Sequence, residues 1–172
     1  MPRIGVVDDM TSIPGRHRLA LAAWTVGTAA EIGLLIALTV DALRRPSAHS
    51  VGRVAAPLAA ERALVHGVGP LIDRTRPRSR FQRPGFLSPS SSSIPSGHAS
   101  NSFLAATLLS ATHPAPIVFG VAAIAATSRV ALRVHRVTDV AVSAITGVGL
   151  GLAMNRWFAP DETESSSHTT HH

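Results

Sequence analysis

A long apolar run near the start of the chain constrains the fold more than any other feature. Residues 19–40 form a run of 22 residues in which Glu31 is the only charged side chain. As a helix rising 1.5 Å per residue, the run would be about 33 Å long, which matches the hydrocarbon core of a bilayer. It is too long for the apolar part of a cleaved signal peptide, and no cleavage site is apparent. We therefore expect a retained transmembrane helix that ends at Arg44-Arg45-Pro46.

The composition also favours helices in lipid. Hydrophobic residues make up 45% of the chain and charged residues 15%, whereas roughly 25% are charged in a typical soluble domain. The net charge is +6, but the arginines lie between apolar runs instead of along one face of a polar domain, so nucleic-acid binding is not expected. Because the chain has no Cys, disulfides and cysteine chemistry are excluded.

Four further segments are predicted to be helical. Residues 54–72 are apolar but carry Pro57, Glu61, Arg62 and His66, so a poor span, an interfacial helix and a packed soluble helix are all compatible with them. Three apolar stretches follow, at about residues 98–112, 117–132 and 137–157, and the last contains Gly147, Gly149 and Gly151, which permit close helix approach. The sequence thus predicts an all-α, integral-membrane bundle of about five helices.

The predicted organisation is one membrane domain between two tails. Residues 1–15 are expected to be a flexible N-terminal tail, residues 16–158 the membrane domain, and residues 159–172, rich in Ser, Thr and His, a disordered C-terminal tail. Inside the domain, residues 73–95 form a polar loop with five arginines. A loop of this length in a compact domain is usually functional or disordered.

The first cluster of chemical interest is Pro95-Ser96-Gly97-His98, directly before an apolar helix. Ser is a favoured N-cap residue, and the free amides of a first helical turn, with the helix dipole, attract anions. Gly97 would let an anion approach the backbone closely, and His98 would project from the same turn. Because the string is short, a capped helix start without further function explains it as well.

The second cluster is Ser128-Arg129, followed after five intervening residues by His135 and after three more by Asp139. If this segment is helical, His135 and Asp139 are one turn apart, and the carboxylate can reach the imidazole. A carboxylate on one ring nitrogen fixes the tautomer and raises the basicity of the other, as a nucleophilic or basic histidine requires. A short loop with a surface ion pair is the alternative explanation.

Topology brings the two clusters together. Two predicted helices separate His98 from Arg129 and His135, so the chain returns to the same membrane face. The arginine-rich loop that precedes His98 lies on that face too. Two histidines, a carboxylate and several arginines are therefore expected to meet at a helix N-terminus.

Together with Arg76-Pro77, these clusters resemble the three-part signature of the type 2 phosphatidic acid phosphatase (PAP2) superfamily, which includes vanadium haloperoxidases and some acid phosphatases. The second and third parts match in order and spacing over the whole pattern. The first part, K-x6-R-P, matches only at Arg76-Pro77, because Gly69 stands where the lysine belongs. We expect Arg74 to supply the missing charge, and a weakened or altered substrate site is the alternative. The resemblance covers roughly residues 69–150.

The resemblance implies a metal-independent hydrolase without a cofactor that forms a phosphohistidine. His135 would be the nucleophile, Asp139 would orient it, and His98 would protonate the departing lipid oxygen and later help to activate water. Guanidinium groups and backbone amides suit the charge on the phosphoryl oxygens. The implied phosphate-binding residues are Arg74, Arg76, Arg129, Ser96 and Gly97.

The expected function is therefore a multi-pass cell-membrane phosphatase acting on a lipid phosphate or a prenyl diphosphate. Two alternatives stay open: a relative of the soluble acid phosphatases and haloperoxidases, and a non-catalytic membrane protein that retains the motif. Arginine bias would place the loop in the cytoplasm, but phosphate binding accounts for those arginines, and the resemblance implies an extracytoplasmic site. We expect the outer face. Nothing in the sequence specifies an oligomeric state.

One ion pair is predicted apart from the motifs. Glu31 lies near the middle of the first run, and Arg62 lies about as deep in the second segment. An isolated charge at the bilayer centre costs at least ~2.5 kcal/mol, so a partner is expected. We predict that Glu31 pairs with Arg62; pairing of Arg62 with Glu61, or a cavity beside Glu31, is the alternative.

Overall fold

The computed structural model describes residues 14–44, 47–72 and 94–158. All regular structure in these ranges is α-helical, and the predicted all-α architecture is confirmed. The described ranges contain five helices: α1 (Pro14–Arg44), α2 (Ala48–Ile72), α3 (Gly97–Leu109), α4 (Ala115–Ala131) and α5 (Val137–Trp157). Residues 1–13 of the predicted N-terminal tail, the predicted C-terminal tail and most of the arginine-rich loop lie outside the described residues. The predicted end of the N-terminal tail was wrong, because its last two residues belong to α1.

The helix boundaries follow the apolar segments closely. Helix α5 spans the predicted segment, whereas α1 continues beyond both ends of its apolar run, because extending a formed helix costs little. Helix α2 begins at Ala48, before the predicted segment, and runs through the buried Pro57 without interruption. Of the three interpretations of this segment, the structure favours a helix that is part of the bundle, because α2 packs against α1, α3 and α5.

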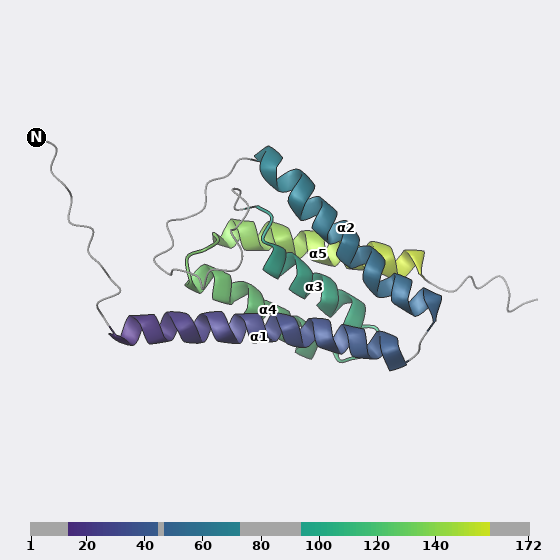
Figure 1. Cartoon of the computed structure of the whole chain (residues 1–172), viewed down its shortest axis with the longest axis horizontal. Helices are drawn as coiled ribbons and strands as arrows, with labels where there is room; N and C mark the ends of the chain where they lie inside the picture. Colours follow the sequence, from purple (N-terminus) through teal and green to yellow (C-terminus); the bar gives the residue numbers. More distant parts are fainter. Residues whose placement is uncertain (1–13, 45–46, 73–93, 159–172) are drawn as a thin grey trace, which may run out of the picture.

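Helix α3 is the central element of the bundle. It packs against all four other helices, and ten of its 13 residues are buried. Figure 1 shows α3 between α1 and α2, with α4 and α5 running beside it. The core consists of aliphatic side chains from α1, α3 and α4: Leu34, Leu38, Leu104, Leu108, Leu109, Val118 and several alanines.

Two of the described helices are long and apolar enough to cross a membrane: α1, over Arg18–Arg44, and α5. Only 17% and 22% of their apolar windows are buried, so neither resembles the core helix of a soluble protein. Their outward faces carry large aliphatic side chains, such as Ile32 and Ile36 on α1 and Ile145 and Leu152 on α5. Such faces suit contact with lipid tails.

Glycines allow close approach at two helix pairs. A Cβ built on Gly147 of α5 would overlap the Ser100 carbonyl oxygen of α3, and one on Gly151 would lie 2.7 Å from Thr107 Cβ. A Cβ on Gly27 of α1 would overlap the Ser128 side chain of α4. The prediction for Gly149 was wrong, because a Cβ there meets no atom within 4 Å; it is exposed, on another face of α5.

Candidate active site

The turn between α4 and α5 holds the backbone of His135 against Arg129. Helix α4 ends in a Schellman motif, in which the Val134 N–H donates to the Arg129 carbonyl at 3.1 Å. The Arg133 N–H completes it by donating to the Val130 carbonyl at 2.8 Å. Arg133 takes the left-handed position, with φ of 52°, where Gly is usual. The His135 N–H also donates to the Arg129 carbonyl, at 3.4 Å.

Asp139 is fully buried in the first turn of α5. Its Oδ2 accepts a hydrogen bond from the Arg136 N–H at 3.0 Å, as the acidic residue of a capping box does. A negative charge at this place is stabilised by the helix dipole. His135, which is 5% exposed, lies in the turn before α5 and not on the helix. His135 and Asp139 are therefore not one turn apart on the same helix, which was the condition under which the sequence predicted their contact.

Ser143 fastens the start of α3 to α5. The Ser96 N–H donates to Ser143 Oγ at 2.6 Å, and the Ser143 hydroxyl donates to the Asp139 carbonyl at 2.7 Å. Ser96, Ser143 and Asp139 are all fully buried. The segment Pro95-Ser96-Gly97-His98 therefore lies against the turn of α5 that carries Asp139, and the two sequence clusters meet as predicted.

Ser96 occupies the predicted N-cap position of α3 with an extended backbone, φ −82° and ψ 103°. The expected capping hydrogen bond from its side chain is not formed, and that part of the prediction was wrong. Its Oγ is buried and has no hydrogen-bond partner among the described residues. A Cβ built on Gly97 would meet no atom within 4 Å. The start of α3 thus combines a buried hydroxyl with a backbone that faces open space in the described part of the chain.

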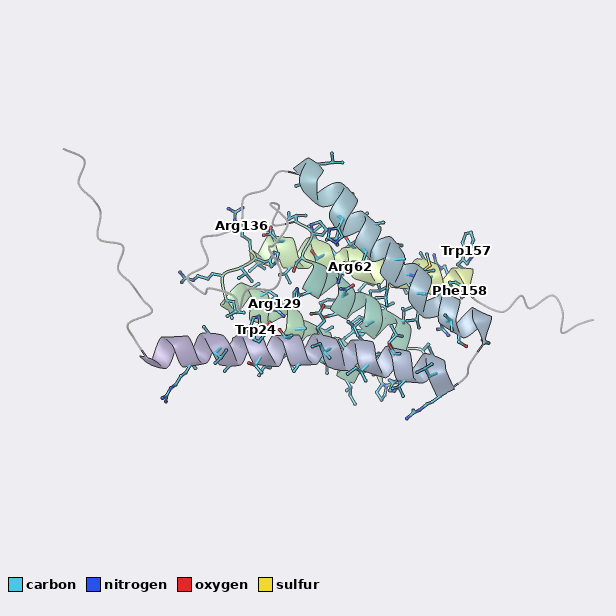
Figure 2. All side chains as sticks on the ribbon, in the orientation of Figure 1. Trp24, Arg62, Arg129, Arg136, Trp157 and Phe158 are labelled. Atoms are coloured by element: carbon cyan, nitrogen blue, oxygen red, sulfur yellow. The ribbon has the colours of Figure 1, made fainter. Side chains whose placement is uncertain are left out.

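Arg129 reaches from α4 across to α1. Its side chain is buried, and Nη2 donates to Thr28 Oγ1 at 2.9 Å. Figure 2 shows the Arg129 side chain at the end of the bundle where α5 begins, with Arg136 at the same end. A guanidinium held in this way presents its charge in a fixed direction, as the binding of a phosphoryl group requires.

His98 contacts Glu31, which overturns the predicted ion pair with Arg62. His98 Nε2 lies 3.4 Å from Glu31 Oε2. Arg62 instead lies on the outer side of α2, with Nε 3.9 Å from Oε2 of its neighbour Glu61, which was the alternative foreseen. The physical reason is that helix α2 turns the long Arg62 side chain outwards, to 60% exposure, while Glu61 is fully buried.

The described site residues converge at one end of the bundle. This end is formed by the start of α3, the end of α4 and the start of α5 (Figure 1). Arg74 and Arg76 lie outside the described residues, and Gly69 lies in the last part of α2. Within the described ranges, no group of three histidine or acidic side chains is arranged to bind a metal ion.

Comparison with known proteins identifies the family. A sequence model of the PAP2 superfamily matches residues 50–162 of the 172. The chain belongs to the PAP2 superfamily. The match covers the positions of the three-part signature, all but the first two residues of α2, and the helices α3 to α5. Among curated protein sequences, none matches the chain.

A solved structure shares the PAP2 fold of this chain. That solved structure is of a protein described as the first transmembrane PAP2-type phosphatidylglycerolphosphate phosphatase from Bacillus subtilis. The TM-score is 0.61 and the sequence identity 22%, with 91% of this chain and 80% of the other covered. At this identity the likeness shows the fold alone, a bundle of α-helices. The predicted fold class is confirmed.

Sequence reasoning did not assign three residues to the site of this PAP2 protein. Ser143 supports Ser96, Thr28 receives the Arg129 hydrogen bond, and Glu31 contacts His98. The position of Ser143, one helical turn after Asp139, is a signal that could have suggested it. No local pattern points to Thr28 and Glu31, because they reach the site only through the packing of α1 against α3 and α4.

Proposed function

We propose that this PAP2 protein is a multi-pass membrane phosphatase that hydrolyses a lipid phosphate or a prenyl diphosphate through a phosphohistidine on His135. The observation that carries the proposal is the joining of the two sequence clusters by Ser143. This contact brings the buried Ser96 hydroxyl, which has no hydrogen-bond partner in the described part of the chain, and the start of α3 to the end of the bundle where Arg129, His135 and Asp139 are buried.

In the first half of the proposed reaction, a ring nitrogen of His135 attacks phosphorus in line with the leaving oxygen. The N–P bond forms as the P–O bond to the lipid breaks, and His98 gives its proton to the departing oxygen. Asp139 keeps His135 in the reactive tautomer. In the second half, His98 takes a proton from water, whose oxygen attacks phosphorus. The N–P bond then breaks and releases inorganic phosphate.

The phosphoryl oxygens are held by groups of fixed geometry. Arg129 is oriented by Thr28, and the Ser96 hydroxyl and the Gly97 amide lie at the start of α3, where the helix dipole favours an anion. Arg76 and Arg74 supply further charge from the arginine-rich loop, Arg74 replacing the lysine absent at Gly69. Because binding and protonation by these side chains suffice for the chemistry, the reaction needs no metal.

An amphiphilic substrate suits this placement. The outward faces of α1 and α5 are aliphatic along much of their length, so the tail of a substrate can stay in the lipid while its phosphate enters the bundle. Prenyl carrier phosphates, prenyl diphosphates and phosphatidic acids share this design. Lipid monophosphates and diphosphates are therefore the substrate classes to compare.

The test is phosphate release from purified protein in detergent with a chelator present. We expect the wild type to hydrolyse at least one lipid phosphate, and His135→Ala to lose activity by at least about 10³-fold, as loss of a nucleophile does. His98→Ala should lose about 10²- to 10⁴-fold, the usual contribution of a general acid. Denatured wild type, but not His135→Ala, should retain an acid-labile, alkali-stable phosphate after a brief reaction.

His113→Ala is the matched control. His113 follows α3 at the other end of the bundle, where its Nδ1 is 2.9 Å from Thr112 Oγ1, and its loss should leave turnover unchanged. Equal activity of His135→Ala and wild type would refute the proposal, and so would a wild type inert toward the whole panel.

A further inference from the structure

Glu31 is a buried acid that the proposed reaction does not use. It lies in the apolar run of α1 and is 8% exposed. Burying a carboxylate in such a place is costly unless other groups compensate for it. Its retention in the bundle therefore calls for an explanation in terms of the groups that it meets.

Those groups come from three other helices. On α3, His98 Nε2 lies 3.4 Å away, and the Asn101 side chain interacts with the carboxylate as a hydrogen-bond donor. On α4, Arg129 attracts it. On α2, Arg62 attracts it weakly and Glu61 repels it. Glu31 thus contacts one residue proposed as the proton donor and interacts with another proposed to bind phosphate.

We propose that Glu31 is a positioning residue that holds the imidazole of His98 in orientation for proton transfer to the leaving oxygen. The proposal rests on the reaction proposed above. The Nε2–H of His98 donates a hydrogen bond to the Glu31 carboxylate, which fixes the ring and favours its protonated form. The proton that leaves in the first half of the reaction then comes from the other ring nitrogen, and the same nitrogen takes up the proton of water in the second half.

The side-chain exposure of His98 shows what the contact with Glu31 adds. The His98 side chain is 41% exposed, against 11% for Glu31, so tight packing alone does not fix its ring. A side chain from the first turn of a helix has several rotamers open to it. Contact with a carboxylate that is itself held by Asn101 selects one of them.

The experiment compares two leaving groups. Departure of an alkoxide needs a proton, whereas p-nitrophenolate leaves without one, so a defect in proton donation appears with an alkyl phosphate and not with p-nitrophenyl phosphate. We expect Glu31→Gln to lower kcat/KM for a lipid alkyl phosphate at least tenfold and to change kcat/KM for p-nitrophenyl phosphate less than threefold, because kcat/KM reports the steps up to departure of the leaving group and not the later attack of water, which both substrates share. The expected tenfold loss is smaller than the roughly 10²- to 10⁴-fold contribution of a general acid, because Glu31→Gln leaves His98 in place.

Three further variants test whether Glu31 acts through His98. Glu31→Asp, which keeps the carboxylate, should restore part of the lost rate. Glu31→Gln combined with His98→Ala should be no slower than His98→Ala alone, because Glu31 acts through His98. Asp41→Asn removes an acid from the last part of α1, where Asp41 accepts from Thr112, and should leave both rates unchanged.

Each outcome decides one proposal. Equal losses on both substrates, or losses that multiply in the double variant, would overturn the role of Glu31 and leave the proposed function standing. Inactivity of the wild type toward both substrates would overturn the proposed function. In that case ¹⁵N NMR of the His98 ring tests the contact alone: Glu31→Gln should shift the Nε2 resonance and Asp41→Asn should not, and an unchanged resonance would also refute the contact.

Discussion

Ser143 shows how much of the site depends on one hydroxyl group. It accepts the Ser96 N–H and donates to the Asp139 carbonyl, and so it links the start of α3 to the start of α5. Both of these hydrogen bonds are buried. Leaving a buried donor or acceptor without a partner destabilises a protein by more than one satisfied hydrogen bond stabilises it. The position of His98, two residues after Ser96, follows from this link.

Replacing Ser143 with Ala should leave the Ser96 N–H buried without a partner. We expect a loss of about 1–3 kcal/mol in the free energy of unfolding, measured as a lower thermal midpoint in detergent, and a lower rate of lipid phosphate hydrolysis. Thr146→Ala is the control, because within the described ranges Thr146 Oγ1 bonds only to the Val142 carbonyl of its own helix. A midpoint that falls equally in both variants would contradict the bridging role of Ser143.

At the scale of single residues, local sequence signals identified motif residues but not their partners. His98, Arg129, His135 and Asp139 were found because their types and spacing form a pattern, and the structure brings their segments together. The Glu31–Arg62 pair was wrong because depth in a bilayer says nothing about the direction in which a side chain points. The fully buried Glu61 and the outward Arg62 are adjacent in sequence, yet they face different surroundings.

Helices α3 and α5 share the most extensive contact in the bundle. Ser143, Gly147 and Gly151 recur every four residues and form one small-residue face of α5, and all three are buried. A Cβ on Gly147 would overlap the Ser100 backbone. The lack of a side chain at Gly147 therefore sets the distance between the two helices. Because α3 carries His98 and α5 carries Asp139, that distance also sets the geometry of the candidate site.

Gly147→Ala should force α3 and α5 apart. We expect a loss of about 1–3 kcal/mol, the usual cost of overpacking a core, together with reduced activity. Gly149→Ala is the matched control, since its Cβ would meet nothing within 4 Å and Ala favours a helix over Gly by up to about 1 kcal/mol. Thermal unfolding of both variants measures the difference, and similar midpoints would show that the α3–α5 contact tolerates a methyl group.

At the scale of elements, prediction from sequence was accurate for the helices and weak for the turns between them. Apolar length defines α5 well, and Pro114 and Pro116 mark the start of α4. The turn at Arg133 could not be foreseen, because the left-handed position is held by Arg where Gly would have been the signal. Likewise, three glycines in α5 appeared equivalent, and only the packing against α3 separates Gly147 and Gly151 from Gly149.

For the whole molecule, five successive helices place the start of α1 and the end of α5 at opposite ends of the bundle. Figure 1 shows α1 beginning and α5 ending on opposite sides. The candidate site lies at the end where α1 begins. Helix α3, with 13 residues, is only about 20 Å long, against about 30 Å for the hydrocarbon core.

Membrane orientation can be tested with single cysteines, because the chain has no Cys of its own. Arg136 is exposed at the site end, and Ala111 is exposed after α3 at the other end. We expect Arg136→Cys to react with a membrane-impermeant maleimide in intact cells, and Ala111→Cys to react only after permeabilisation. The reverse pattern would place the site in the cytoplasm, and the cysteine-free wild type gives the background.

The contacts of α1 change what counts as the functional unit. The region shared with the family begins at residue 50, yet Thr28 and Glu31 reach Arg129 and His98 from the helix before it. That first helix looks like a simple anchor, but its side chains contact two of the residues that would carry out the chemistry. A chain shortened to the shared region would still carry every signature residue and would lack the supports that aim two of them.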